Sequence, residues 1–237
     1  MPLSAIATGQ VDYVLKPEEM PAQLIAYIPY VFGKTHQVTS KFEGLMKNIF
    51  NFLHIKTGHD FSHYKYGTIN RRVERRMAVL NIENVNEYVR YLEQKPAEVE
   101  VLFHDLLIGV TSFLRNPEAY EALQEQVIPC LFAGKYPESS IRVWVPGCST
   151  GEEAYSIAIL LQEQMDNLNQ NFKVQIFATD IDSKAIEKAR SGLYPANIAV
   201  DMSSERLKRF FTLDSDGYYH IQHNIREMVI FFRAGYH

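Results

Sequence analysis

The spacing of apolar residues divides the chain into a helical part and a part in which strands alternate with helices. From Ser40 onward, apolar residues recur every three or four positions, a period that predicts α-helix. Helices are expected from Ser40 to about residue 53, over 68–80, over 84–94 and over 96–108. Asn116-Pro117 is typical of a helix start and opens a fifth helix that ends near Phe132.

After residue 134, short apolar segments alternate with amphipathic ones. Strands are expected over 141–145, 173–179 and 228–232, and helices over 152–165, 183–190 and about 204–211. This alternation is typical of βαβ units, so it predicts a parallel sheet and an α/β fold class. The turn residues 214–217 predict a hairpin before the last strand.

The N-terminal segment has a different character. The first thirty residues hold four of the ten prolines and one possible helix, over 21–27. We therefore expect a tail or linker over 1–35, a helical domain over 36–115 and an α/β domain over 116–237.

The composition is that of a globular protein. With 46% hydrophobic and 22% charged residues, the chain is neither collagen-like nor disordered. A net charge of −4 argues against general nucleic-acid binding. Cys130 and Cys148 are too few for a disulfide scaffold, and no apolar run approaches the ~18 residues of a membrane span. Since no signal peptide is recognisable, we expect a soluble cytoplasmic protein.

The turn after the first strand carries the main chemical signal. Its glycines, Gly147 and Gly151, let the backbone approach a ligand closely. Asp180 ends the second strand, where nucleotide-binding α/β folds place an acid on ribose hydroxyls. Glu152 and Glu153 open the next helix and would repel phosphate, so an adenosine with a cationic tail, such as S-adenosylmethionine, fits better. A plain tight turn with a glutamate favoured by the helix dipole explains the same residues equally well.

The same turn also matches G-x-S-x-G, the nucleophile elbow of α/β-hydrolases, with Ser149 as the nucleophile. Asp180 or Asp182, and then His220 or His223, follow in the required order. A hydrolase elbow comes after several earlier strands, whereas here it would follow the first core strand. The hydrolase is therefore the weaker alternative.

Several runs of sequence resemble CheR-type chemotaxis receptor methyltransferases. They span 108–117 (IGVTSFLRNP), 146–156 (PGCSTGEEAYS), 178–182 (ATDID) and 189–194 (ARSGLY). Upstream, Tyr66, Thr68 and the arginine pairs at 71–72 and 75–76 are similar to that family's N-terminal helical domain. The resemblance covers roughly residues 40–232 in the family's order.

The resemblance implies a class I (Rossmann-like) S-adenosylmethionine-dependent methyltransferase domain after the helical domain, with a small β-subdomain at about 194–226. It implies methylation of glutamate side chains on the cytoplasmic helices of chemoreceptors, and in some members the β-subdomain holds a receptor tail peptide. The implied cofactor and substrate site comprises Thr111, Arg115, Gly147, Gly151, Glu152 and Asp180. Within it Arg115 would align the acceptor carboxylate, Asp180 would bind the ribose, and Glu152 would lie near the methionine end.

Some features depart from the family. Gly109 replaces a residue that is often polar, and Leu114 replaces a usual Phe. The family continues into further strands, so we expect a C-terminally incomplete domain whose activity and tight cofactor binding need those strands; a receptor-binding fragment without catalysis is the alternative. Residues 5–9, 11–12, 14–15 and 18–21 resemble the C-terminal end of a CheB-type methylesterase, which suggests an excerpt from a fused chain.

The helix expected from Thr68 has a basic face opposite its apolar one. That face carries Arg71, Arg72, Arg75 and Arg76. It could steer an acidic receptor bundle, or it could be a solvated face neutralised by the acidic helices that follow. No metal site is expected. His59 and His63 are four residues apart, as in some zinc sites, but Gly58 and Asp60 predict a loop and not a helix there.

Overall fold

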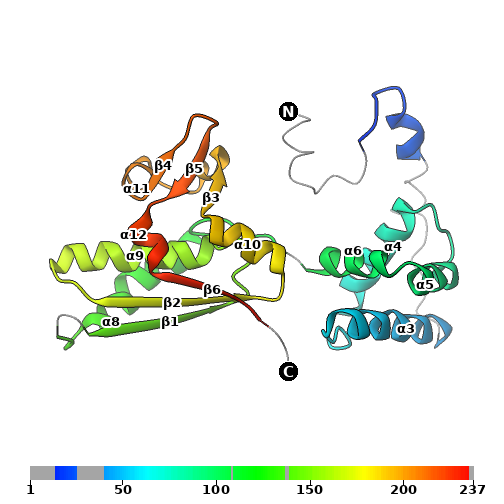
Figure 1. Ribbon diagram of the computed structural model, residues 1–237, viewed down its shortest axis with the longest axis horizontal. Coiled ribbons are helices and arrows are strands. Elements are labelled where there is room, and N and C mark those ends of the chain that lie inside the picture. The colour runs from blue at the N-terminus through cyan, green and yellow to red at the C-terminus, as the bar shows by residue number, and fades with distance from the viewer. Residues whose placement is uncertain (1–13, 26–39, 108, 137–138, 235–237) are drawn as a thin grey trace. The chain divides into compact units, whose positions relative to one another are not determined.

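The computed structural model describes residues 14–25, 40–107, 109–136 and 139–234. The chain forms two compact units that divide after Leu107, the first helical and the second α/β (Figure 1). The division comes earlier than the expected boundary at residue 115, because Phe113 is fully buried in the core of the second unit. In the N-terminal segment, residues 20–25 are helical, and the methylesterase-like residues 1–13 lie outside the described ranges.

The helical unit contains the four helices that apolar spacing predicts. They are α3 (Ser40–Thr57), α4 (Tyr66–Val79), α5 (Val85–Gln94) and α6 (Pro96–Leu106). The Asn84 side chain caps α5 by accepting a hydrogen bond from the backbone N–H of Asn86, at 2.9 Å. The apolar face of α4, which includes Ile69, Val73 and Met77, is buried in the core of this unit.

A buried ion pair joins α4 to α6 and removes Arg76 from the expected basic face. The Arg76 guanidinium donates two hydrogen bonds of 2.8 Å to the Glu98 carboxylate, and its side chain is only 11% exposed. The Tyr88 hydroxyl donates a third bond, of 3.0 Å, to the same carboxylate. Burial opposes the charge on Arg76, but the bonds to Glu98 outweigh it and raise the pKa of the guanidinium. The prediction that Arg76 lies on a solvent-facing basic surface was therefore wrong. It rested on helical position alone, whereas the partner of Arg76 lies on another helix.

The second unit is built on a parallel sheet, which confirms the predicted α/β class. Its main elements are β1 (Ser140–Pro146), α9 (Glu152–Leu168), β2 (Lys173–Asp180), α10 (Ser183–Ser191) and β6 (Val229–Arg233). The strand order is β1-β2-β6, and Val145, Ala178 and Phe231 stand beside one another across the sheet. The β1–α9 loop, residues 147–151, therefore lies at the carboxyl edge of the sheet beside the end of β2.

A second, antiparallel sheet is inserted between α10 and β6 (Figure 1). It comprises β3 (Leu193–Pro195), β4 (Phe211–Leu213) and β5 (Tyr218–Ile221) in the order β3-β5-β4, with the 3₁₀ helix η2 (Ala196–Val200), α11 (Ser204–Phe210) and α12 (His223–Glu227) around it. The hairpin turn forms because the Asp214 carboxylate accepts hydrogen bonds from the backbone of Asp216 and Tyr218.

The expected fifth helix is present as α7 (Pro117–Ala122), a π-helical turn η1 (Leu123–Val127) and α8 (Ile128–Phe132).

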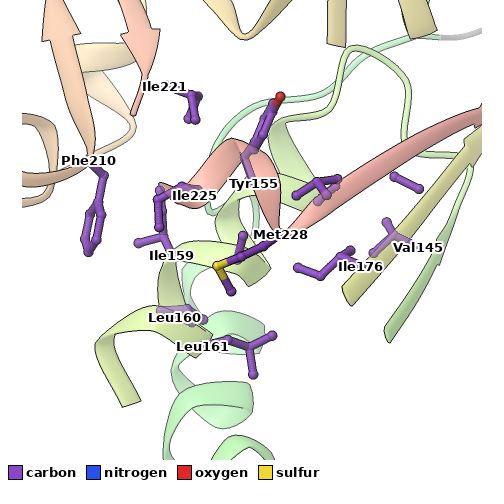
Figure 2. Packing of buried hydrophobic residues seen from close by; sticks show 14 of the residues in the cluster. Val145, Tyr155, Ile159, Leu160, Leu161, Ile176, Phe210, Ile221, Ile225 and Met228 are labelled. Carbon is purple, nitrogen blue, oxygen red and sulfur yellow. The ribbon is translucent and has the colours of Figure 1, made fainter. Parts of the chain in front are cut away.

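The two faces of the parallel sheet differ in cover. One face packs against α9, where Ile159 and Leu160 lie near Met228 and Ile225 (Figure 2). The other carries Trp144, which is 66% exposed, and Phe232, which is 47% exposed. Parallel sheets are normally covered on both faces. Among the described residues, this second face has no such cover.

Candidate functional site

The β1–α9 loop is held in an unusual backbone conformation by the end of β2. Gly147, Ser149 and Gly151 all have positive φ, at 67°, 47° and 94°. One oxygen of the Asp180 carboxylate accepts a hydrogen bond of 2.7 Å from the Ser149 N–H, and the other accepts one of 2.9 Å from the Asp182 N–H. Each carboxylate oxygen can accept a second bond, so Asp180 can fix the loop and still bind a hydroxyl.

A hollow of about 550 Å³ lies beside this loop. Three parts of the second unit form its walls: the segment before α7, the α7–η1 helix, and the loop with the start of α9. The lining residues are Val110, Thr111, Ser112, Arg115, Asn116, Ala119, Tyr120, Leu123, Gly147, Ser149, Glu153 and Ile157. The size is within the range of small-molecule sites.

Segment 109–116, which forms one wall, is strained and firmly anchored. Leu114 and Asn116 have φ of 49° and 66°, which side chains with a Cβ rarely adopt. The Leu114 N–H donates a 3.0 Å hydrogen bond to the buried Ser156 hydroxyl, and Phe113 lies in the core. Arg115 bends back so that its guanidinium donates to the Val110 carbonyl, at 2.5 Å. Strained residues of this kind cluster at functional sites, and here they border the hollow.

The structure brings some of the expected site residues together and separates others. Thr111, Arg115 and Gly147 line the hollow. Gly151 does not, since a Cβ there would come within 2.9 Å of Ala189; this glycine lets α9 start close to α10. The geometry therefore gives Gly151 a packing role between α9 and α10.

Glu152 also lies away from the hollow. Its side chain is 8% exposed, and the Thr150 hydroxyl donates to the carboxylate at 2.6–2.9 Å. Burial raises the pKa of this carboxyl group. Its neighbour Glu153, by contrast, is exposed and lines the hollow.

Helical periodicity could have distinguished these two glutamates. Glu153 and Ile157 are four residues apart and both line the hollow, whereas Glu152 and Ser156 are four apart and both buried. Tyr120 also lines the hollow, although it is not among the site residues expected from the sequence. Burial, with the nearby Glu153 carboxylate, raises the pKa of Tyr120 to about 12.

The structure does not assemble a hydrolase triad around Ser149. The Ser149 hydroxyl lies 3.4 Å from the Gly109 carbonyl. His220 lies 2.8 Å from an Asp214 oxygen in the antiparallel sheet, and His223 pairs with Glu227 on α12. Both candidate histidines are thus engaged elsewhere.

Within residues 14–25, 40–107, 109–136 and 139–234, no group of three or more His, Cys, Asp or Glu side chains could hold a metal ion. His59 is buried and stacks on Phe103, with ring centroids 5.4 Å apart, so its ring is part of the helical core.

The residues around the hollow fit S-adenosyl-L-methionine. A Cβ added at Gly147 would meet nothing within 4 Å, so the backbone there opens onto free space that a ligand can approach. Asp180 does not itself line the hollow, but it bonds to the lining residue Ser149 and has acceptor capacity for ribose hydroxyls beside the loop. Glu153 and Arg115 supply opposite charges to the walls, which suits a ligand with a sulfonium, an ammonium and a carboxylate.

Two protein-family models match the chain. The CheR methyltransferase SAM binding domain matches residues 109–235, and the CheR methyltransferase all-alpha domain matches residues 45–107. These two stretches correspond to the two compact units. The first model indicates S-adenosyl-L-methionine as the cofactor, in agreement with the chemistry of the hollow.

Curated proteins similar to this chain include chemotaxis methyltransferases and one protein without an assigned activity. An "Uncharacterized 104.1 kDa protein in hypE 3'region" of Rhodobacter capsulatus is 34% identical over 98% of this chain and 27% of its own length. The "Chemotaxis protein methyltransferase" of Borreliella burgdorferi is 29% identical, covering 79% of this chain and 66% of the relative. That of Salmonella typhimurium is 30% identical, covering 70% and 55%. The chain thus matches less than two thirds of these relatives' lengths. Within the described residues, no helix combines the length and apolar character needed to cross a membrane.

Proposed function

Since this chain belongs to the CheR methyltransferase family, we propose that it transfers a methyl group from S-adenosyl-L-methionine to glutamate side chains on the cytoplasmic domain of a chemoreceptor. The observation that carries the proposal is the hollow beside the carboxyl edge of the sheet, with Arg115 and Glu153 both in its lining. Open α/β sheets bind ligands outside the carboxyl ends of their strands.

Four residues would hold the cofactor. Asp180 would accept hydrogen bonds from the ribose hydroxyls while still fixing the Ser149 N–H. Gly147 offers bare backbone to the ligand, and Thr111 offers a hydroxyl from the opposite wall. Glu153 would face the positive charges of the methionine end. When bound, S-adenosyl-L-methionine supplies a methyl group on a cationic sulfur, which keeps the electron pair of the breaking bond as the acceptor oxygen attacks.

The acceptor needs orientation rather than activation. A glutamate carboxyl group has a reference pKa of ~4.3, so it is already ionised at neutral pH and needs no general base. The Arg115 guanidinium has donors beyond the one used by Val110, and its planar fork can hold one carboxylate oxygen while the other points at the methyl group. Such alignment, together with removal of water in the hollow, is the main contribution this chain would make.

The helical unit would supply receptor contact. On α4, Arg71 is exposed and Arg72 is half-buried, whereas Arg76 is committed to Glu98. Arg75 is half-buried and also has an interaction within the chain. Arg71 and Arg72 are therefore the arginines of this face that would meet the acidic receptor helices. Opposite charges across such a contact speed encounter and set orientation.

The test is transfer of a radiolabelled methyl group to glutamates of a receptor cytoplasmic fragment. The Arg115→Ala variant should lower the rate about 100-fold through lost alignment, while Arg115→Lys keeps charge without the fork and should recover only part. Arg142→Ala is the matched control, because Arg142 is exposed on β1 and does not line the hollow.

Binding measurements separate catalysis from docking. S-adenosylhomocysteine should bind the chain, and Asp180→Ala should weaken that binding. Tight binding by this chain would overturn the expectation that tight binding needs further strands. The Arg71→Glu, Arg72→Glu double variant should reduce receptor binding without changing that affinity. Receptor binding without any methyl transfer would instead indicate a docking fragment, and it would overturn the proposed activity for this chain.

A further inference from the structure

One side chain of the antiparallel sheet contacts both the β1–α9 loop and segment 109–116. Tyr194, on β3, is 1% exposed, and its hydroxyl donates a 2.8 Å hydrogen bond to the Thr150 carbonyl in the β1–α9 loop. Its ring packs edge-on against Phe113, with centroids 4.9 Å apart. Phe113 lies between Thr111 and Arg115, so one tyrosine contacts both the loop and segment 109–116.

The bond from Tyr194 enters a larger buried network. The Thr150 hydroxyl donates to the Glu152 carboxylate, at 2.6 Å to the nearer oxygen. The Ser156 hydroxyl donates to the Glu152 carbonyl at 2.7 Å and accepts from the Leu114 N–H at 3.0 Å. Hydrogen bonds through Glu152 and Ser156 therefore connect the loop, the first turn of α9 and segment 109–116.

We propose that Tyr194 is a positioning residue for the cofactor site, and that cofactor affinity therefore depends on the antiparallel sheet from which Tyr194 comes. This inference rests on the proposed function of the hollow. Tyr194 does not line the hollow, so it acts through Thr150 and Phe113. The sheet β3-β5-β4 is then part of the cofactor site and not merely a surface beside it.

The direction of the hydrogen bond supports this role. Burial, together with the Glu152 charge, raises the pKa of Tyr194 well above its usual value, so the hydroxyl stays protonated and donates at all ordinary pH values. Without that donor the Thr150 carbonyl would lose its partner in a partly buried position, which favours a shift of the loop.

The test compares two tyrosine-to-phenylalanine substitutions. Tyr194→Phe keeps the ring that packs on Phe113 but removes the donor to the loop. Tyr155→Phe is the matched control: Tyr155 is equally buried and lies in the same aromatic cluster, but its hydroxyl donates to the Ala189 carbonyl of α10, at 2.9 Å. Two quantities are measured on the full chain: the S-adenosylhomocysteine dissociation constant by calorimetry, and hydrogen exchange of the loop amides without ligand.

The amides of Ser149 and Gly151 are suitable reporters, because they donate to the Asp180 carboxylate and the Cys148 carbonyl. Tyr194→Phe should weaken S-adenosylhomocysteine binding roughly tenfold, which corresponds to about 1.4 kcal/mol, and should speed exchange at both amides. Tyr155→Phe should lower the melting temperature to a similar degree but leave affinity within about twofold and loop exchange unchanged.

The outcomes separate the two proposals. If both variants bind like the parent chain and their loop amides exchange alike, Tyr194 has only a structural role and the inference is overturned while the proposed function stands. If the parent chain does not bind S-adenosylhomocysteine, the proposed function fails for this chain. In that case faster loop exchange in Tyr194→Phe alone would still support the positioning role, and equal exchange would refute it.

Discussion

Substitution of alanine for Gly147 or for Gly151 should affect stability and cofactor binding in opposite rank order. Both Gly147 and Gly151 have positive φ, so an alanine at either position adopts a left-handed conformation that costs ~1–2 kcal/mol. Reduced entropy of the unfolded chain offsets about 0.4–1 kcal/mol of this. The two positions differ in what the new methyl group meets.

At Gly147 the added Cβ has no atom within 4 Å, so Gly147→Ala should lower the free energy of unfolding by only about 1 kcal/mol. At Gly151 the Cβ would come within 2.9 Å of the Ala189 Cβ and 3.1 Å of the Phe231 ring. Overpacking of this kind adds ~1–3 kcal/mol, so Gly151→Ala should cost about 2–4 kcal/mol in total. Urea unfolding followed by circular dichroism measures both values, since the midpoint shifts while the slope stays constant.

Cofactor binding should show the reverse order. The Gly147 backbone lines the hollow, so its methyl group would take space from the ligand, and S-adenosylhomocysteine binding should weaken strongly. Folded Gly151→Ala, measured at low temperature, should bind far better than Gly147→Ala. Equal destabilisation by the two variants, or unimpaired ligand binding by Gly147→Ala, would refute the assignment of Gly147 to the site and of Gly151 to packing.

Three further predictions concern buried groups. Glu98→Ala should destabilise the helical unit by ~3 kcal/mol in urea unfolding, because it leaves the buried Arg76 charge with only the more distant Asp105 carboxylate, 3.9 Å away. The Arg76→Met, Glu98→Leu double variant should regain most of that loss, and an unchanged midpoint in Glu98→Ala would contradict the buried pair. Burial raises the pKa of Tyr155 to about 12, so its contribution to stability is full below pH ~10 and is lost as pH rises toward 12; thermal melts from pH 8 to 11.5 should fall more steeply for the parent chain than for Tyr155→Phe. Burial, with the Asp180 charge, also raises the pKa of the Cys148 thiol to about 12, so Ellman's reagent at pH 8 should modify only the exposed Cys130 rapidly and both thiols only after unfolding; two fast equivalents would argue against it.

Local sequence signals predicted most of the elements but few of the long-range contacts. The four helices of the first unit follow from the spacing of apolar residues. The start of α5 is likewise a local feature, because the Asn84 side chain bonds to the backbone only two residues later. Arg76 was misassigned since its partner, Glu98, lies 22 residues away on another helix, and helical position alone does not show which arginine is buried. Glu152 and Glu153 could have been distinguished, because burial on α9 follows its period.

The boundary between the two units could not be predicted from local sequence. Segment 109–116 has no regular structure, so its sequence carries no period that would assign it to either unit. Its place is fixed by Phe113, which packs against Tyr194 and Phe211 roughly eighty to one hundred residues later in the chain. Such contacts depend on the folded topology and have no local signature.

The sheet face that is exposed among the described residues carries an intrinsic fluorescent probe. Trp144 is the single tryptophan of the chain, and its indole N–H donates to the Thr179 hydroxyl while most of its ring faces solvent. Its fluorescence emission should therefore be red-shifted and readily quenched by iodide or acrylamide. A polypeptide that binds this face and buries Trp144 would shift the emission to shorter wavelength. A fluorescence titration can therefore measure such binding without a label.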